Sequence, residues 1–282
     1  MIAVIYSGSR FADWKLADKG KIISNFKTVG INPFFNDEKF ITQVLNKNDS
    51  LITYAERIKK IYFFGAGASS KERNEIISGA FSKFFKFSKI SVDNDLKAGA
   101  IAACGDKECI IGILGSGSNA AYFDGKKIKL NNFGLGFVLA DEGSANWMGK
   151  KILKSFLNET LPPHLVSDLR QKYGLDRKLI LDKVYRQPQP VLYLSLFADY
   201  LLENKTDQFI ETLVKEGFNT YCTTYLVPLS IENPGCPIHI VGTIAFGFEA
   251  WLREVAEENN LTIATIIKEP IYNVLNYYSD KN

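Results

Sequence analysis

The segment GSGSN, residues 115–119, has the residue types of an anion-binding turn. It follows the apolar run Cys109–Leu114, for which the sequence predicts a buried strand. Glycines let backbone N–H groups point at an anion without interference from a side chain, and serines add hydroxyl donors. A similar turn, SGS at residues 7–9, follows the apolar strand Ile2–Tyr6. Two such turns could hold the phosphates of a nucleotide, and the alternative is that each is an ordinary hairpin turn.

Carboxylates at two predicted strand-to-helix junctions are candidates for proton transfer. The first junction, VDNDLKAG, contains Asp93 and Asp95. A junction of this kind lies at the ligand-binding edge of an α/β sheet, so a carboxylate there could accept the proton of a substrate hydroxyl during phosphoryl transfer. Capping of the helix by Asp93, Asn94 or Asp95 is the alternative interpretation. Asp141 and Glu142 precede another predicted helix and have the same two interpretations.

Two further segments could contact a sugar or a nucleotide. Asn32 lies in GINPFFN, and its amide can both donate to and accept from a sugar hydroxyl, although Asn-Pro is also a common start of a turn. Gly242 lies in VGTIAFG, whose order of strand, glycine and helix suits a nucleotide. Either feature alone is a weak signal.

The composition excludes several classes of protein. The chain has 282 residues, 46% of them apolar, which suits one large domain or two lobes with a sizeable core. A net charge of +3 indicates neither a nucleic acid nor a membrane surface as partner. The basic aromatic stretch Lys83–Lys89 is typical of the end of an amphipathic helix, with RNA binding as the alternative. No apolar run reaches the ~18 residues of a membrane span, and the first residues do not resemble a signal peptide.

The numbers and spacing of cysteine and histidine residues limit the kinds of site that the chain can form. We expect the cysteines to be reduced thiols of a cytoplasmic protein, because the sequence has neither a secretion signal nor a CxxC motif. With only two histidines, a His-rich metal site is excluded and a Ser–His–Asp hydrolase is disfavoured. The residues concerned are Cys104, Cys109, Cys222, Cys236, His164 and His239.

The elements that must position these residues follow a repeated order. In the first half, a strand, a Gly-Ser turn and a hairpin around Asp18–Gly20 are followed by helices that alternate with strands. We expect an N-capped helix over Asp37–Leu45, and a helix over Ser70–Phe84 that is capped by Ser69 or Ser70. The second half restarts at Cys109 with a strand, GSGSN and a hairpin whose strands are Ala120–Phe123 and Lys127–Leu130. We interpret this order as a weak internal duplication.

The duplication predicts an α/β protein of two lobes around a central cleft, each lobe built on a βββαβα unit. We place the lobes at residues 1–104 and 105–282, with a terminal helix at about 270–280 that can pack back on the first lobe. Inserted helices make the second lobe larger. The helical segments expected there include Ser144–Leu157, Pro163–Tyr173, Leu181–Tyr185, Pro190–Glu203 and Thr206–Tyr221.

Taken in order, these motifs resemble the bacterial branch of the N-acetylglucosamine kinase group within the BadF/BadG/BcrA/BcrD-type ATPases. The resemblance covers nearly the whole chain, and the ordered set of motifs is specific although each motif alone is not. It implies a two-lobed actin-like ATPase fold, which is ribonuclease H-like, and ATP-dependent phosphorylation of an amino sugar, N-acetylglucosamine at its 6-hydroxyl. The matching segments are SGS and DW within residues 7–14, GINPF (30–34), GAG (65–67), GSGSN (115–119), DEGS (141–144), VYRQPQP (184–190) and PIHIVGTIA (237–245).

The resemblance implies roles for individual residues. Asp95 aligns with the general base that accepts the proton of the sugar hydroxyl. Asn32, Gly67 and Asp141 fall where the family contacts N-acetylglucosamine. Glu142 adjoins that site.

The resemblance also implies where ATP and Mg²⁺ would bind. Residues 115–119 form a second phosphate loop, in which Ser118 and Asn119 also belong to the sugar pocket, and Gly242 lies against the adenosine. Mg²⁺ would be held through Asp95 or Asp93. The residues implied to contact the nucleotide are Ser7, Gly8, Ser9, Arg10, Gly115, Ser116, Gly117 and Gly242.

The first turn departs from the pattern of the family, which reads DSGSTKTDW where this chain has YSGSRFADW. Tyr6 stands in place of the aspartate that helps to hold Mg²⁺, and Arg10–Ala12 replace residues that face the γ-phosphate. Loss of one such electrostatic contact commonly costs ~10²–10³ in rate. Arg10 could act as a replacement clamp on the phosphate, and Asp13 or Asp93 could hold the metal.

Three functions are compatible with these observations. The chain is an active amino-sugar kinase with an altered first phosphate loop, or it is a degenerate kinase that binds sugar without transferring phosphate and acts as a regulator. A third class is an ATPase coupled to another protein. Such a protein would need an activator or a partner with a cysteine-ligated cluster, and nothing in the sequence points to one. The expected partner is a small amino sugar, with a homodimer as an open alternative. No nucleic acid or membrane partner is expected.

Overall fold

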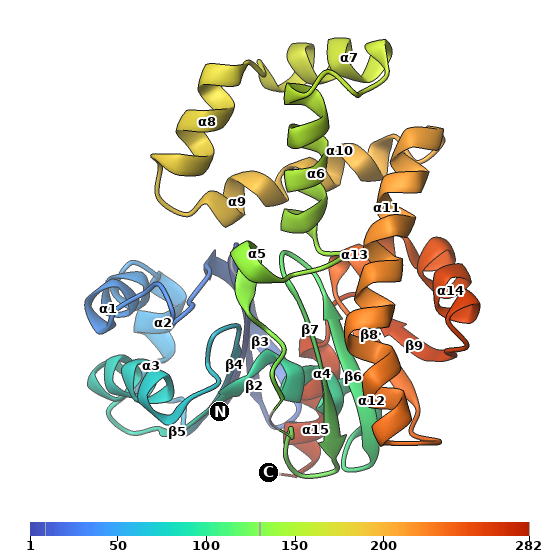
Figure 1. The fold of residues 1–282 in the computed structure, drawn as a ribbon. Coiled ribbons are helices and arrows are strands. Elements are labelled where there is room, and N and C mark those ends of the chain that lie inside the picture. Colours follow the sequence, from blue (N-terminus) through green and yellow to red (C-terminus); the bar gives the residue numbers. More distant parts are fainter. Residues whose placement is uncertain (9, 130, 282) are drawn as a thin grey trace. The chain divides into compact units, whose positions relative to one another are not determined.

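The computed structural model describes residues 1–8, 10–129 and 131–281, so that Ser9, Leu130 and Asn282 lie outside the described part. The chain forms two compact units (Figure 1). Each unit contains one β-sheet with helices packed on it, which confirms the predicted α/β class. The first unit comprises residues 1–109, 123–128 and 269–282, and the second comprises residues 110–122 and 129–268.

The sheet of the first unit has the strand order β3-β2-β1-β4-β5. Strand β2 runs antiparallel to both β1 and β3, whereas β1, β4 and β5 are parallel. Lys19 and Gly20 have positive φ angles of 49° and 77° at the tip of the β2–β3 hairpin, which confirms the turn predicted there. The strands are β1 (Ile2–Ser7), β2 (Phe11–Asp18), β3 (Lys21–Val29), β4 (Lys60–Gly65) and β5 (Lys89–Asn94).

The parallel strands of this sheet end at the same edge. Ser7 at the end of β1 is paired with Gly65 at the end of β4, and Gly65 is paired with Asn94 at the end of β5. The segments that follow these three strands therefore begin side by side. They are the first Gly-Ser turn, the GAG segment, and the helix that begins at Asp95.

Helices cover both faces of the first sheet. The side chains of Ala3 and Ile5 point to the face covered by α1, α2 and α3, and Val4 points to the face covered by α4 and α15. Asp37 caps α1 and Ser70 caps α3, as the sequence predicts. The helices are α1 (Glu38–Asn46), α2 (Asp49–Tyr54), α3 (Lys71–Phe84), α4 (Asp95–Cys104) and α15 (Ile271–Asp280).

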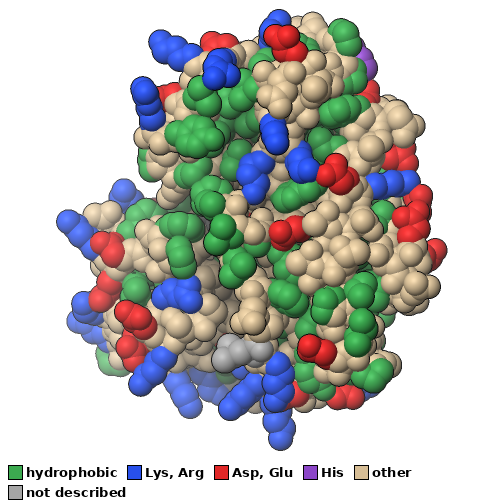
Figure 2. All heavy atoms as spheres, viewed as in Figure 1, with side chains coloured by type: hydrophobic (Ala, Val, Ile, Leu, Met, Phe, Trp, Pro, Cys, Tyr) green, Lys and Arg blue, Asp and Glu red, His purple; other side chains and the backbone are tan. Residues whose placement is uncertain are grey.

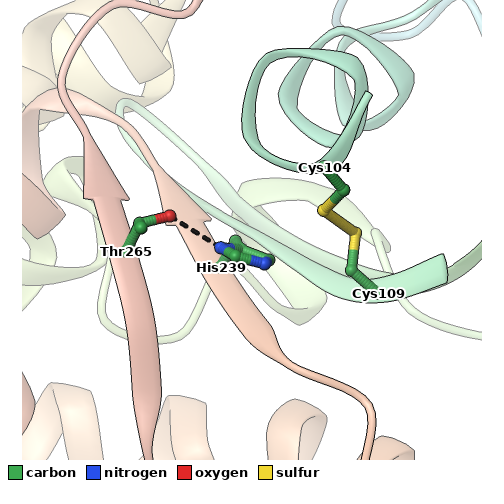
Figure 3. Close-up of a disulfide and its surroundings, with 4 residues drawn as sticks. All are labelled: Cys104, Cys109, His239 and Thr265. Carbon is green, nitrogen blue, oxygen red and sulfur yellow. Dashed lines mark hydrogen bonds between the residues drawn. A yellow bond between two sulfur atoms is a disulfide. The ribbon is translucent and has the colours of Figure 1, made fainter. Parts of the chain in front are cut away.

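A disulfide joins Cys104, the last residue of α4, to Cys109 (Figure 3). The expectation that all four cysteines are reduced is therefore wrong for this pair, whereas Cys222 and Cys236 are not joined by a disulfide. The physical reason is that the short turn after α4 brings the two Cα atoms to 6.8 Å, within the range of a disulfide. The same turn is held by α15, because the Tyr277 hydroxyl donates a hydrogen bond to the carboxylate of Asp106.

The sheet of the second unit has the strand order β7-β6-β8-β9, in which β8 is parallel to both β6 and β9. The hairpin strand expected at residues 127–130 is not formed over its described residues. They contribute an isolated bridge between Phe123 and Ile128, and Leu130 lies outside the described residues. The strands are β6 (Glu108–Leu114), β7 (Ser118–Asp124), β8 (Ile238–Val241) and β9 (Ile263–Ile267).

Helices dominate the second unit and enclose its apolar core, with α7, α8, α9 and α10 at the end away from the strands (Figure 1). The single helix expected over Pro190–Glu203 is two helices with Leu196 between them, and a π-helical turn, Cys222–Leu226, was not predicted. The helices are α5 (Gly136–Leu139), α6 (Ala145–Leu157), α7 (Pro163–Tyr173), α8 (Arg177–Tyr185), α9 (Pro190–Ser195), α10 (Phe197–Glu203), α11 (Gln208–Tyr221), α12 (Val227–Glu232), α13 (Thr243–Gly247) and α14 (Glu249–Glu258). In the described part of the chain, no helix is both long enough and apolar enough to cross a membrane.

Candidate functional site

The second Gly-Ser turn, residues 115–119, connects β6 to β7 and is fixed to the first turn of helix α6. The backbone N–H and the side-chain amide of Asn146 both donate to the carbonyl of Ser116, at 3.1 and 2.6 Å. Within the turn, the N–H of Gly115 donates to the carbonyl of Gly117 at 3.0 Å. The turn is therefore a rigid part of the second unit and is held by a helix as well as by its strands.

Asp141 provides the carboxylate beneath this turn. Its side chain accepts hydrogen bonds from the N–H of Ser118 at 3.1 Å and from the amide of Asn146 at 2.7 Å. The residue is 8% exposed and has a φ of +65°, an uncommon backbone conformation for a residue other than glycine. Burial raises the pKa of Asp141 and is partly opposed by these two hydrogen bonds. A buried carboxylate in a strained conformation is a frequent feature of functional sites.

Glu142 and Lys150 extend the charged cluster around Asp141. The hydroxyl of Tyr225 donates a hydrogen bond to the carboxylate of Glu142, and the ammonium of Lys150 donates to the carbonyl of Phe137. Burial lowers the pKa of Lys150, and the nearby carboxylates of Asp141 and Glu142 oppose that effect. The cluster thus combines two acids with one partly desolvated cation.

Asn119 closes the second turn and is held from two sides. The hydroxyl of Tyr221 donates to its backbone carbonyl at 3.1 Å, and its own side-chain oxygen accepts from the N–H of Ala120 at 2.8 Å. Gly134 lies so close to the Asn119 amide that a Cβ atom there would approach its nitrogen to 2.6 Å. The side chain of Asn119 is therefore enclosed between the turn and the segment that leads into α5.

The segment that leads to Asp141 exposes apolar side chains. It contains α5, over which apolar side chains gather on the face seen in Figure 2. The carbonyl of Phe137 at the centre of α5 is the group that Lys150 binds. The exposed residues of this segment are Leu135, Val138 and Leu139, with 60%, 72% and 74% of their surface accessible.

Gly242 follows β8 and lies against the base of the second turn. Its φ is +133°, and a Cβ atom there would overlap the carbonyl oxygen of Leu114, the last residue of β6. The parallel pairing of Ile113 with Val241 brings these two strand ends together. Because a side chain does not fit, glycine is required at this position, and the structure places Gly242 beside the base of the second turn.

The first Gly-Ser turn, in the other unit, is closed by its own hydrogen bonds. The hydroxyl of Ser7 donates to the carbonyl of Ile31 at 2.9 Å and accepts from the N–H of Ile31 at 2.8 Å. The N–H of Gly8 donates to the carbonyl of Phe11 at 3.0 Å. Ser9, a further predicted contact to the nucleotide, lies outside the described residues. The polar groups of Ser7 and Gly8 thus hold the turn together.

Tyr6 stands beside acidic residues on the first sheet. It is paired across the strands with Asp13, whose carboxylate forms an ion pair with the buried Lys15 at 3.1 Å. Burial, and to a smaller extent the charge of Asp95, raises the pKa of Tyr6 well above its usual range. Tyr6 is therefore a neutral phenol. Arg10 lies over the ring of Phe11, 5.4 Å from its centre.

At the junction of β5 and α4, one residue caps the helix and its two acidic neighbours make other contacts. The side chain of Asn94 is the helix cap and accepts the N–H of Lys97 at 2.9 Å. Asp93 forms an ion pair with the ammonium of Lys97 at 2.6 Å. Asp95 is the first residue of the helix and accepts the N–H of Leu96 at 3.0 Å. Capping is thus performed by Asn94, and Asp95 lies close enough to Tyr6 to influence its pKa.

Asn32 and Gly67, which the resemblance assigns to the sugar, lie in contact with each other. Asn32 is 9% exposed, and its side-chain oxygen accepts the N–H of Phe34 at 2.9 Å. Gly67 has a φ of +80°, and a Cβ atom there would overlap the Asn32 side chain. The pair forms a compact polar corner in which glycine is required for close approach.

The carboxylates near the first turn fit a magnesium ion poorly. Asp93 and Asp13 are each paired with a lysine, and Tyr6 offers a neutral phenol where a hard cation needs oxygens of high charge. Over the described ranges, no group of three or more His, Cys, Asp or Glu side chains could hold a metal ion. We therefore derive no chemical step through a metal.

Four residues of the second unit were missed by the sequence reasoning. Asn146 lies in the segment ADEGSANW (residues 140–147), so its place one helical turn after Glu142 was a usable signal. Lys150 follows it by one further helical turn. Tyr221 and Tyr225 come from α11 and the π-turn, about 80 residues later in the chain, and no local pattern indicates their contacts.

Solved structures resemble this chain over almost its whole length. A proposed N-acetylglucosamine kinase from Porphyromonas gingivalis matches over 99% of this chain and 99% of that chain, with a TM-score of 0.93 and 31% sequence identity. A proposed N-acetylglucosamine kinase from Chromobacterium violaceum matches over 98% of each chain, with a TM-score of 0.69 and 13% identity. A glucokinase of the ROK family from Streptomyces griseus, solved with glucose and AMPPNP, covers 98% of this chain and 97% of that chain, with a TM-score of 0.55 and 16% identity.

The second and third of these likenesses show a shared fold. No family model matches the chain, and a comparison with curated proteins finds no match.

Proposed function

This chain belongs to the N-acetylglucosamine kinase-like proteins of the actin-like ATPase fold, and from that premise we propose that it transfers a phosphoryl group from ATP to the 6-hydroxyl of N-acetylglucosamine. The observation that carries the proposal is the buried carboxylate of Asp141. It is held beneath the second turn by Ser118 and Asn146, in a backbone conformation that costs free energy. Such an arrangement is expected where a carboxylate must bind a polar ligand.

Residues of both units receive roles in this proposal. Asp95 accepts the proton of the attacking hydroxyl, which makes the oxygen a better nucleophile. Asp141 and Asn119 bind hydroxyl groups of the sugar, and Asn32, kept close to Gly67, binds it with its amide.

The nucleotide contacts are assigned to the turns and to one glycine. The backbone N–H groups of Ser116 and Gly117 are assigned to the phosphates, in a turn that the N–H of Gly115 closes, and Gly242 at the base of this turn is assigned to the nucleoside. Arg10 is assigned to the phosphates as a cationic clamp. When bound, ATP supplies the phosphoryl group.

A second function is favoured by a specific observation at the first turn. The hydroxyl of Ser7 is occupied by Ile31, the N–H of Gly8 is occupied by Phe11, and Tyr6 is a neutral phenol. A turn in this state offers few groups for a phosphate and a metal ion. The second candidate is therefore a protein that binds the amino sugar without transferring phosphate.

One experiment separates the two candidates. Binding of N-acetylglucosamine is measured by calorimetry, and formation of phosphosugar from ATP is measured in the presence of Mg²⁺, for the wild type and for Asp95→Asn. The kinase proposal expects turnover in the wild type, a loss of ~10²–10⁴-fold in Asp95→Asn, and sugar binding in both. Sugar binding without phosphosugar supports the second candidate. Absence of sugar binding overturns both.

A further inference from the structure

Helix α11 changes its hydrogen-bonding pattern where it passes the charged cluster around Asp141. The π-turn Cys222–Leu226 lies between α11 and α12. A π-turn adds a residue to one turn of a helix and turns the side chains that follow, and such turns are frequent at functional sites. The proposed reaction gives this π-turn no role.

The helix lies directly against the turn that carries Asp141 and Glu142. Gly143 has a φ of +69°, and a Cβ atom there would approach the carbonyl oxygen of Gly217 in α11 to 2.8 Å. Two hydroxyl groups reach the candidate sugar-binding residues from the same stretch of chain. Tyr221 donates to the backbone of Asn119, and Tyr225, in the π-turn, donates to the carboxylate of Glu142.

The side chain of Tyr225 is fixed before any ligand arrives. The residue is 1% exposed, and its ring packs edge-on against Phe133 and Tyr221, with centres 4.9 and 5.3 Å apart. Burial and the neighbouring Glu142 raise the pKa of Tyr225, so that its hydroxyl stays protonated and can act as a donor. Glu142 is itself half-buried and is thereby held in one orientation.

An unpartnered acceptor next to this pair indicates that a ligand completes the cluster. The side-chain oxygen of Asn146 is fully buried and has no hydrogen-bond partner among the residues that the structure describes, although its nitrogen binds Asp141 and Ser116. A buried acceptor without a partner calls for a bound donor. Together with the carboxylates of Asp141 and Glu142, this oxygen forms a set of acceptors, which suits a ligand with several N–H or O–H donors.

We propose that Tyr225 is a positioning residue for sugar recognition: it orients Glu142, which accepts a hydrogen bond from a donor group of the sugar. The donor is the amide N–H of an N-acyl group or a ring hydroxyl. This inference rests on the proposed binding of an amino sugar and does not depend on whether phosphate is transferred. Tyr225 acts through Glu142 and does not itself contact the substrate.

The test measures the Kd of N-acetylglucosamine and of glucose by calorimetry. The proteins compared are the wild type, Tyr225→Phe, Glu142→Gln, the double variant, and Tyr193→Phe as a matched control. The hydroxyl of Tyr193 is buried in α9 and has no hydrogen-bond partner in the described ranges, so its removal controls for loss of a buried hydroxyl. Phenylalanine keeps the ring of Tyr225 in its packing.

We expect Tyr225→Phe to raise the Kd of N-acetylglucosamine about 5- to 30-fold, because it removes one hydrogen bond to a charged group. The double variant should bind no more weakly than Glu142→Gln alone, because the tyrosine acts through the glutamate. Tyr193→Phe should bind as the wild type does. Where turnover is measurable, KM should rise by more than kcat falls.

The two probes identify the donor, and the variants decide the inference. A larger effect on N-acetylglucosamine than on glucose assigns the amide N–H, and equal effects assign a hydroxyl; both support the proposal. Wild-type affinity in Tyr225→Phe, or additive losses in the double variant, would overturn it. If the wild type binds neither sugar, the proposed function fails first, and the inference fails with it.

Discussion

The two Gly-Ser turns of this chain follow the same kind of strand, but different groups hold them in place. In the first turn, the hydroxyl of Ser7 is tied to Ile31 and the N–H of Gly8 closes the turn onto Phe11. In the second turn, the carbonyl of Ser116 is bound by α6, and the N–H of Ser118 is bound by the Asp141 carboxylate. The first turn is thus held by backbone and hydroxyl groups, and the second by backbone and amide groups together with a buried carboxylate.

This difference indicates that the same short motif has a structural role in one turn and a ligand-binding role in the other. A neutral closure such as that of Ser7 stabilises a turn at little electrostatic cost. A buried carboxylate at positive φ, such as Asp141, is costly and is retained where it serves a ligand. The second turn is therefore the better candidate for ligand chemistry, and the first has the character of a structural element.

The largest expected effect comes from replacing, by alanine, the residue whose side chain holds each turn. Asp141→Ala leaves the N–H of Ser118 and the amide of Asn146 without an acceptor, so we expect the free energy of unfolding to fall by about 1–3 kcal/mol and sugar affinity to fall at least about 100-fold. Ser7→Ala leaves the N–H of Ile31 unpaired and should lower stability by a similar amount. Urea unfolding and calorimetry with N-acetylglucosamine measure the two quantities.

The contrast between the two turns requires that Ser7→Ala keep its sugar affinity. Equal losses of affinity in Asp141→Ala and Ser7→Ala would show that the two supports do not differ in function. Equal stabilities with unequal affinities would sharpen the comparison, because fold stability would then be excluded as the cause of the affinity loss.

A smaller effect is expected from giving the first turn a charge. Tyr6→Asp introduces a carboxylate at the end of β1, close to Asp95. We expect it to make ATP binding depend on Mg²⁺, with an affinity gain of about 10-fold in the presence of the ion. Tyr6→Asn is the matched control, because it leaves the same cavity without the charge. Titration of ATP with and without Mg²⁺ provides the measurement.

If Tyr6→Asp and Tyr6→Asn bind ATP alike in Mg²⁺, the neutral first turn is not what limits nucleotide binding, and the comparison between the turns loses its functional meaning. A Mg²⁺-dependent gain confined to Tyr6→Asp would show that the missing charge is the main difference.

Local signals account for the parts of the fold that the sequence predicted. The hairpin at Lys19 and Gly20 and the caps at Asp37 and Ser70 depend on side chains within three residues of the backbone that they serve. The two Gly-Ser turns follow apolar strands, and the structure places them at the carboxyl ends of β1 and β6.

Other features of the structure could not be predicted in this way. Cys104 and Cys109 were expected to be reduced, because neither the secretory context nor the spacing indicates a disulfide, yet the turn after α4 brings them together. Leu196 interrupts an otherwise continuous helical pattern, and Tyr225 meets Glu142 across 83 positions of sequence. The contact of Tyr225 with Glu142 is decided by tertiary packing, which a local pattern does not encode, whereas Cys104 and Cys109 are neighbours in sequence that no motif marks as a pair.

The smallest expected effect concerns the pH dependence of stability and compares the two histidines, both of which belong to the second unit. His239 lies on β8, beside the strand that carries the second turn. It is 8% exposed, and its Nδ1 is 2.6 Å from the hydroxyl of Thr265 (Figure 3). Burial lowers the pKa of His239 below its usual value. The unfolded chain, with a histidine pKa near ~6.5, therefore binds more protons than the folded chain as the pH falls below that value.

By linkage, the free energy of unfolding should fall by up to about 1 kcal/mol between pH 7.5 and pH 5.5 on account of His239. His239→Gln should flatten this dependence. His164→Gln should keep it, because His164 has a largely exposed side chain that is hydrogen-bonded to Asp207 on the surface. Urea unfolding at the two pH values measures the difference. Equal slopes in all three proteins would show that His239 is not the source of the acid sensitivity, whereas a flattened slope in His239→Gln alone would place an acid-sensitive group in the sheet that carries the second turn.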